Sequence, residues 1–113
     1  MNLRFAILTD EITKTWSGFT TKEYKSFKDL KKENLRDHMS NLELVLNMLA
    51  EASTTEISKD KQPKTFIENK VIAKKGGEVA KAARLKLESN TGKKVVTNQN
   101  AKGLKSKENK EIL

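Results

Sequence analysis

The stretch that decides the fold is residues 28–57, KDLKKENLRDHMSNLELVLNMLAEASTTEI. Its first part mixes lysine with acidic residues, and its second part is a run of leucine, valine and methionine interrupted by one narrow polar stripe. A helix that is apolar around most of its circumference has to be covered by other parts of the protein, because a domain does not leave such a surface in water. We therefore expect a central helix around which the rest of the chain packs.

The start of this central helix is marked by a capping box. Ser40 and Glu43 have the spacing at which each side chain bonds the backbone N–H of the other residue, and Met39 with Leu44 supplies the flanking hydrophobic pair. We expect the helix to end within residues 54–59.

The same signature precedes two other predicted helices. Thr20 with Glu23 predicts a short helix over about residues 21–30, and Thr65 with Glu68 predicts the start of the last helix. In the short helix we expect three apolar residues to face inward: Tyr24, Phe27 and Leu30. A first helix over residues 3–16 is predicted by four apolar residues at three- and four-residue spacing: Phe5, Leu8, Ile12 and Trp16.

The last predicted helix contains the pair Gly76-Gly77. Each glycine weakens a helix by about 1 kcal/mol relative to alanine, so a break at the pair is one interpretation. The other is that Gly76, which falls on the apolar side, lets a second helix approach closely. The apolar spacing from Ile72 to Leu87 continues unbroken across the pair. We therefore expect one continuous helix that reaches Thr91-Gly92.

Together these patterns predict an all-α fold, a small bundle of about four helices. Residues 1–97 form the predicted helical domain, and residues 98–113, which lack apolar periodicity, form a predicted disordered basic tail. Residues 93–97 (KKVVT) suit a short strand, but no partner strand is visible.

Composition narrows the classes of function. The 113 residues carry a net charge of +8, which favours polyanions such as DNA, RNA, acidic protein surfaces or anionic membrane. Cysteine is absent, so there is neither a disulfide framework nor a thiolate metal site. No apolar run is long enough to span a membrane, and the N-terminus does not suit a secretory signal, so we expect a cytoplasmic protein that does not act at a membrane.

Residues suited to catalysis are scarce. His38, the single histidine, stands beside Asp37 and Ser40, but neighbours in sequence do not make a catalytic triad. The chain has no glycine-rich phosphate loop and no metal-ligand cluster. We expect no enzyme activity, no cofactor and no metal.

The candidate binding residues are cations. With 100° per residue, four of them fall on one stripe about 180° from the apolar side of the last helix: Lys70, Lys74, Lys81 and Arg84. Such a stripe suits phosphate contacts. The alternative is a solvated face that only keeps the protein soluble.

A second basic group precedes the central helix: Lys28, Lys31, Lys32 and Arg36. Acidic residues interrupt it, so pairing within the segment is the stronger interpretation. Lys31 and Lys32 are kept as candidate nucleic-acid contacts. The aromatic residues near the cations are expected in the core, because their helical spacing places them there.

The chain resembles the C-terminal region of DNA-damage-inducible protein D and of related phage antirepressor proteins with a Bro-like N-terminal domain. The resemblance covers most of the chain except the tail and is strongest in these segments: Phe5-Ala6-Ile7, Leu30-Lys31-Lys32, Asp37-His38-Met39, Glu43-Leu44, Asn47, Ala52, Thr55-Glu56, Phe66, Asn69, Ala73, Gly76-Gly77, Ala80, Arg84 and Thr91–Val96. The positions carried over on this basis are Lys31, Lys32, Asp37, His38, Met39, Gly76, Gly77 and Arg84.

The resemblance implies a bacterial or phage protein of the DNA-damage response that acts through DNA or a recombinase–DNA filament. The Bro-like domain that normally precedes this region is missing here, which suggests a split-gene product, a relic, or a partner to a separately encoded N-terminal protein. The preferred function is a non-enzymatic accessory module of the damage-response or antirepressor type. The alternative is a protein-interaction domain that forms a homo-oligomer or binds a Bro-like partner.

Overall fold

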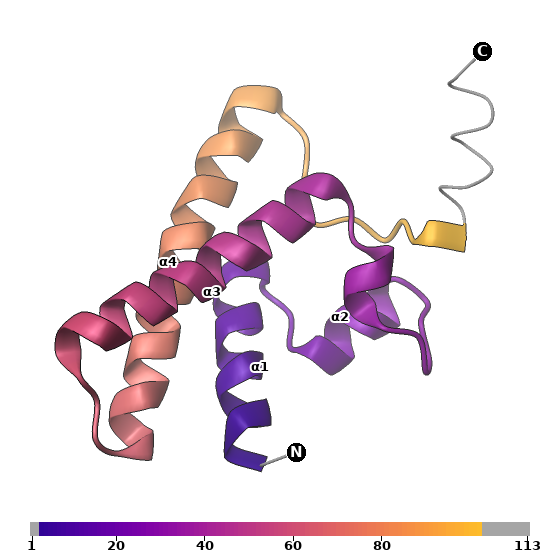
Figure 1. Ribbon diagram of the computed structural model, residues 1–113. Coiled ribbons are helices and arrows are strands. Elements are labelled where there is room, and N and C mark those ends of the chain that lie inside the picture. The colour runs from indigo at the N-terminus through magenta and orange to yellow at the C-terminus, as the bar shows by residue number, and fades with distance from the viewer. Residues whose placement is uncertain (1–2, 103–113) are drawn as a thin grey trace.

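The protein folds as a small all-α domain (Figure 1). The computed structural model describes residues 3–102, and within them no segment is a strand, residues 93–97 included. The elements in chain order are α1 (Leu3–Ser17), α2 (Thr21–Phe27), the 3₁₀ helix η1 (Leu35–His38), α3 (Asn41–Lys61) and α4 (Phe66–Thr91). The predicted all-α bundle of about four helices is confirmed.

The helices form two layers. α1 and α4 lie side by side, and α3 crosses over both of them (Figure 1). The shorter elements α2 and η1 lie beside the N-terminal end of α3, away from the loop that joins α3 to α4. α3 is thus the central helix of the fold, but within residues 3–102 one side of it is left uncovered.

The capping residues confirm the predicted helix starts. Ser40 Oγ accepts a hydrogen bond from the Glu43 N–H at 3.2 Å, and the Glu43 carboxylate accepts one from the Ser40 N–H at 3.0 Å. The box at Thr20 and Glu23 is also complete. α3 continues to Lys61, two residues beyond the expected range, and ends where Gln62 adopts a left-handed conformation with φ 50°.

α4 runs unbroken through Gly76-Gly77, so the predicted continuity is confirmed. Both glycines are buried, and each one faces a different helix. Gly76 lies against Thr54 of α3, and Gly77 lies against Thr15 and the Ile12 carbonyl of α1. The pair therefore stabilises the packing of three helices although it weakens the isolated α4 helix.

Two aromatic residues form the centre of the core. Trp16 and Tyr24 are fully buried, and Trp16 Nε1 donates a hydrogen bond to Asn47 Oδ1 at 3.0 Å. Leu30 is buried although it lies beyond the end of α2. The prediction that Phe27 faces inward is wrong: its side chain is 40% exposed, because α2 ends at this residue and the chain then turns.

A buried charged network joins α2 to α3. The Lys28 ammonium group, 0% exposed, donates to Glu43 Oε1 at 2.9 Å, and the Tyr24 hydroxyl donates to the other oxygen of the same carboxylate. Burial and the neighbouring Glu43 raise the pKa of Tyr24. Each buried charge has a partner, which is the condition for keeping it inside a protein.

Residues 98–102, expected to belong to the tail, are held against α2 and η1. The Gln99 carbonyl accepts from Lys28 Nζ at 2.6 Å, and the Ala101 N–H donates to His38 Nδ1 at 2.9 Å. The Lys102 ammonium group is 2.5 Å from a Glu33 oxygen. The remainder of the predicted tail, residues 103–113, lies outside the described residues.

Candidate functional site

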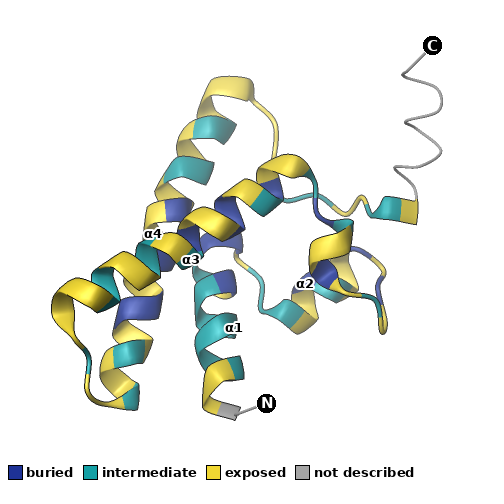
Figure 2. Ribbon diagram, in the orientation of Figure 1, coloured by how far each residue is buried: buried dark blue, intermediate teal, exposed yellow. Residues whose placement is uncertain are grey.

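One side of α3 presents large apolar side chains to solvent. Four of them have exposed fractions of 49, 56, 54 and 36%: Leu42, Val45, Met48 and Leu49. We call these four residues, together with the exposed Ala52, the outer face of α3. Figure 2 shows this face as a largely exposed strip along the middle of the molecule. The other elements within the described part of the chain therefore cover only part of the apolar circumference of α3.

The charge of this region differs from that of the rest of the chain. Residues 37–58 contain neither lysine nor arginine, in a protein that has 23 such residues. The acidic Glu43 is buried, and Glu51 pairs with Arg36. The outer face of α3 is thus apolar and free of cations. Such a surface is typical of sites at which proteins bind one another.

Three of the four predicted stripe cations lie together on α4 and are exposed: Lys70, Lys74 and Lys81. With about 100° per residue they lie roughly 120–160° around the helix from Gly76, which faces α3. They therefore point away from α3. Lys74 and Lys81 also line a groove of about 560 Å³ between α1 and α4, where Lys14 joins them. Glu11 and Glu78 line the same groove.

The fourth predicted cation, Arg84, lines the same groove as Lys74 and Lys81, but it is largely buried. Its side chain is only 14% exposed, because its Nε donates to the Trp16 carbonyl at 2.7 Å and it pairs with Glu88 at 3.1 Å. α1 ends at Ser17, so the Trp16 carbonyl is one of the last carbonyls of the helix and has no partner within it. Arg84 supplies that partner, and its role is to join α1 to α4.

The carboxylate of Glu88 extends this link to the segment after α4. It accepts hydrogen bonds from the Val95 N–H at 3.0 Å and from the Arg84 guanidinium. Burial opposes ionisation, but the Val95 hydrogen bond and the Arg84 guanidinium hold the pKa of Glu88 below its usual value. The i,i+4 spacing of Arg84 and Glu88 is a signal for this ion pair that the sequence already contains. The bonds to the Trp16 carbonyl and the Val95 N–H have no such signal, because only the fold brings those groups together.

Lys31 and Lys32 are exposed on the loop between α2 and η1. The Glu33 carboxylate accepts hydrogen bonds from both of their backbone N–H groups. Lys32 lines a different pocket from the one that Lys74 and Lys81 line. The structure thus does not bring the two predicted groups of cations together into one surface.

His38 and Ser40, the residues considered for a catalytic triad, make hydrogen bonds that hold the fold together. His38 Nδ1 accepts from the Ala101 N–H, and Ser40 Oγ caps α3 by accepting from the Glu43 N–H. Within residues 3–102, no three His, Cys, Asp or Glu side chains gather in a way that suits a metal ion. None of the helices in that range combines the length and hydropathy that crossing a membrane requires.

Comparison with known proteins gives no match: no protein-family model, no curated protein and no solved structure is similar to this chain.

Proposed function

We propose that the chain is a non-catalytic interaction module and that the outer face of α3 binds the same face of a second copy. The observation that carries the proposal is the exposure of Leu42, Val45, Met48 and Leu49 on one helix. Burying a leucine or valine side chain contributes about 1.5–3 kcal/mol relative to leaving it in water. These four side chains are not buried by any contact within residues 3–102. Burying them against a partner would therefore lower the free energy.

Charge is the reason for choosing a second copy as the partner. Each chain carries a net charge of +8, so two copies repel one another over most of their surfaces. The outer face of α3 avoids this repulsion, because neither lysine nor arginine occurs in residues 37–58. Leu42, Val45, Leu49 and Ala52 also repeat at intervals of three and four residues, as in paired helices. Two copies of α3 that pack face to face form an isologous dimer.

Light scattering coupled to size exclusion tests the dimer. We expect the wild type to pass from monomer to dimer over the micromolar range, since one helix face buries less than the roughly 800 Å² per partner of a standard interface. Leu42→Lys with Val45→Lys keeps the chain monomeric. Leu85→Lys is the control for a lysine at an exposed apolar position outside α3, because Leu85 of α4 has the same 49% exposure as Leu42. A monomeric wild type at every concentration contradicts the proposal, and a complex formed only with a Bro-like protein assigns the face to that partner instead.

A second candidate function is polyanion binding by Lys70, Lys74 and Lys81. The observation in its favour is that all three are exposed and point away from α3. On this proposal the module belongs to the cytoplasmic DNA-damage response or acts as an antirepressor, and it binds DNA or a recombinase–DNA filament. The two functions are compatible, because the cations and the outer face of α3 occupy different sides of the molecule.

A further inference from the structure

A pocket of about 540 Å³ opens between α1, α2, η1 and α3. Its volume falls within the range of small-molecule sites, about 300–1,000 Å³. Neither the outer face of α3 nor the lysines of α4 contribute to it. The two surfaces invoked above therefore do not account for this pocket.

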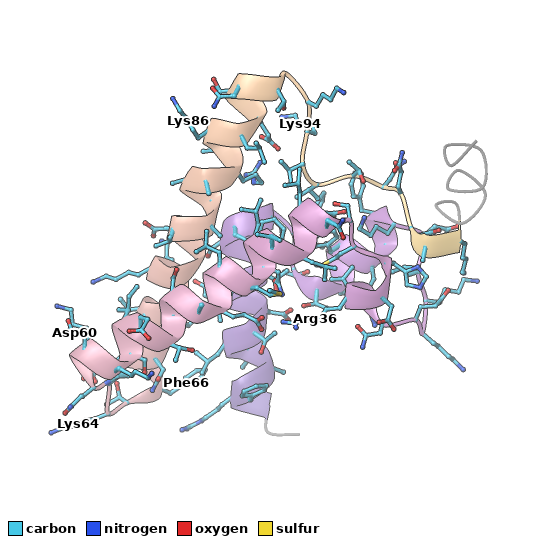
Figure 3. All side chains as sticks on the ribbon, turned by 45° about the horizontal axis from the view of Figure 1, so that its top comes forward. Arg36, Asp60, Lys64, Phe66, Lys86 and Lys94 are labelled. Atoms are coloured by element: carbon cyan, nitrogen blue, oxygen red, sulfur yellow. The ribbon has the colours of Figure 1, made fainter. Side chains whose placement is uncertain are left out.

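Three of the four charged residues that line the pocket are cations. Lys25 comes from α2, Lys32 from the following loop and Arg36 from η1. The one carboxylate in the lining is Glu51, which pairs with Arg36, so its charge is already neutralised. Figure 3 shows Arg36 extending from η1 towards the space between α3 and α1. The lining contains no carboxylate that balances the charge of Lys25 and Lys32.

Asn47 of α3 adds a buried donor. Trp16 Nε1 can only donate, so the oxygen of the Asn47 amide must face it, at 3.0 Å. The NH₂ group of Asn47 has no hydrogen-bond partner within residues 3–102, although the residue is only 7% exposed. Every fully enclosed polar side-chain atom in that range is bonded, so this NH₂ group keeps some contact with solvent, and Asn47 is one of the residues that line the pocket.

The rest of the lining includes apolar side chains. Ile12 comes from α1, Leu35 is the first residue of η1, and Met39 follows η1. Leu35 and Met39 are each 7% exposed, so they belong to the buried core and form a fixed surface. A ligand that fits this pocket has an anionic group for the cations and a carbon skeleton for the apolar side.

We propose that this pocket binds a small organic phosphate. The phosphate contacts Lys25, Lys32 and Arg36 and accepts a hydrogen bond from the Asn47 amide. A phosphate monoester fits this set better than a carboxylate, because it carries more charge and three acceptor oxygens for several donors. The carbon skeleton lies against Ile12, Leu35 and Met39. The inference does not depend on dimerisation through α3 or on DNA binding through the lysines of α4, because it uses none of those side chains. Lys32, a candidate nucleic-acid contact in the sequence, is assigned to the phosphate instead.

Calorimetric titration of the full chain with AMP, adenosine and inorganic phosphate tests the site. We expect AMP to bind with a Kd of about 10–100 µM, as ligands of this size do. Adenosine, which lacks the phosphate, should bind at least tenfold more weakly, and so should inorganic phosphate, which lacks the skeleton. Adenosine binding as tightly as AMP overturns the anion site. Inorganic phosphate binding as tightly as AMP overturns the role of the apolar side.

Neighbouring lysines provide matched controls for general charge effects. Lys25→Gln and Lys32→Gln should each weaken AMP binding at least fivefold. Lys22→Gln and Lys31→Gln should change it less than twofold, because these residues lie on the same segments without lining the pocket. Equal losses from all four variants reveal nonspecific attraction to a +8 protein and overturn the proposal.

Asn47→Asp tests the buried donor. Aspartate keeps an acceptor oxygen for Trp16 but replaces the amide NH₂ by a negative charge, so AMP binding should fall at least tenfold. Thermal unfolding of the variant shows whether the domain is intact. If the variant unfolds at room temperature, the Lys25→Gln and Lys32→Gln results decide. Unchanged AMP affinity in a folded Asn47→Asp chain contradicts the assignment of Asn47.

Discussion

Gly76 of α4 lies directly against the backbone of Thr54 in α3. A Cβ atom at Gly76 would be 1.8 Å from Thr54 Oγ1 and 2.7 Å from the Thr54 Cα, distances at which the two helices would have to separate. The contact explains why the glycine is tolerated in the middle of a 26-residue helix. Close approach of α3 and α4 stabilises the domain by more than glycine costs in helix propensity.

Gly76→Ala should therefore destabilise the protein, although alanine favours an isolated helix. Overpacking of this kind costs about 1–3 kcal/mol in the free energy of unfolding, measured by urea denaturation. Lys75→Ala is the control: Lys75 is exposed, so its substitution should change stability by less than about 0.5 kcal/mol. A stabilised Gly76→Ala variant would contradict the close approach of the helices.

Arg84→Gln should lower the free energy of unfolding, because Arg84 joins α1 to α4. We do not expect its main effect to be a loss of DNA binding. The substitution removes the hydrogen bond to the Trp16 carbonyl and leaves the carboxylate of Glu88 without its cation. Loss of a charged hydrogen bond at a mostly buried position costs about 1.5–3 kcal/mol. Urea denaturation measures the effect. If the variant is as stable as the wild type but binds DNA more weakly, Arg84 contacts DNA and is not only a structural residue.

Stability should fall in acid partly because of Glu88. The pKa of Glu88 in the folded protein lies below its usual value of 4.5, so the ionised form favours folding at neutral pH. That contribution is lost as pH falls below 4.5 and through the folded-state pKa. Glu33, whose pKa is lowered to about 2 by its contact with Lys102, changes in the same direction.

Glu88→Gln isolates the contribution of this carboxylate. The variant should be less stable than the wild type at pH 7, and the difference should shrink as the pH falls below 4.5 and the wild-type carboxylate takes up its proton. Urea denaturation at pH 7 and at a series of lower pH values provides the comparison. A difference that stays constant with pH would show that the ionised Glu88 does not stabilise the fold.

Nucleic-acid binding through α4 should show a limited dependence on salt. Four phosphate contacts would give a log–log slope of about −3.6 on duplex DNA, but Arg84 is engaged with Trp16 and Glu88, so three contacts give about −2.7. Lys74→Glu with Lys81→Glu should abolish binding without unfolding the domain. Lys22→Glu with Lys59→Glu changes the net charge equally at other sites and should retain most of the affinity. Binding that does not vary with salt would exclude phosphate contacts.

Much of the fold is predictable from local signals. The capping boxes at Thr20 and Ser40 predict where α2 and α3 begin, because those hydrogen bonds join residues three positions apart. The unbroken spacing from Ile72 to Leu87 predicts that α4 continues through the glycines. For Phe27 the local signals mislead. The prediction that its side chain faces the core assumes a helix that continues to Leu30, whereas α2 ends at Phe27.

The candidate site is less predictable, because its chemistry depends on residues far apart in the chain. Arg84 fits the exposed stripe by helical spacing, yet it bonds a carbonyl 68 residues away. Lys28 belongs to a basic group for which pairing within its own segment is expected, yet its partners are Glu43 of α3 and the Gln99 carbonyl, which lie outside that segment. Periodicity gives the direction of a side chain from its own helix but not the partner that another element supplies.

Dilution of isotope-labelled protein, followed by amide NMR from about 1 mM to 10 µM, examines the outer face of α3 residue by residue. We predict concentration-dependent shifts centred on Leu42, Val45, Met48 and Leu49, with little change along the lysine side of α4. The shifts should vanish in the Leu42→Lys, Val45→Lys variant and persist in Leu85→Lys. Shifts confined to other elements, or none over this range, would contradict self-association through α3.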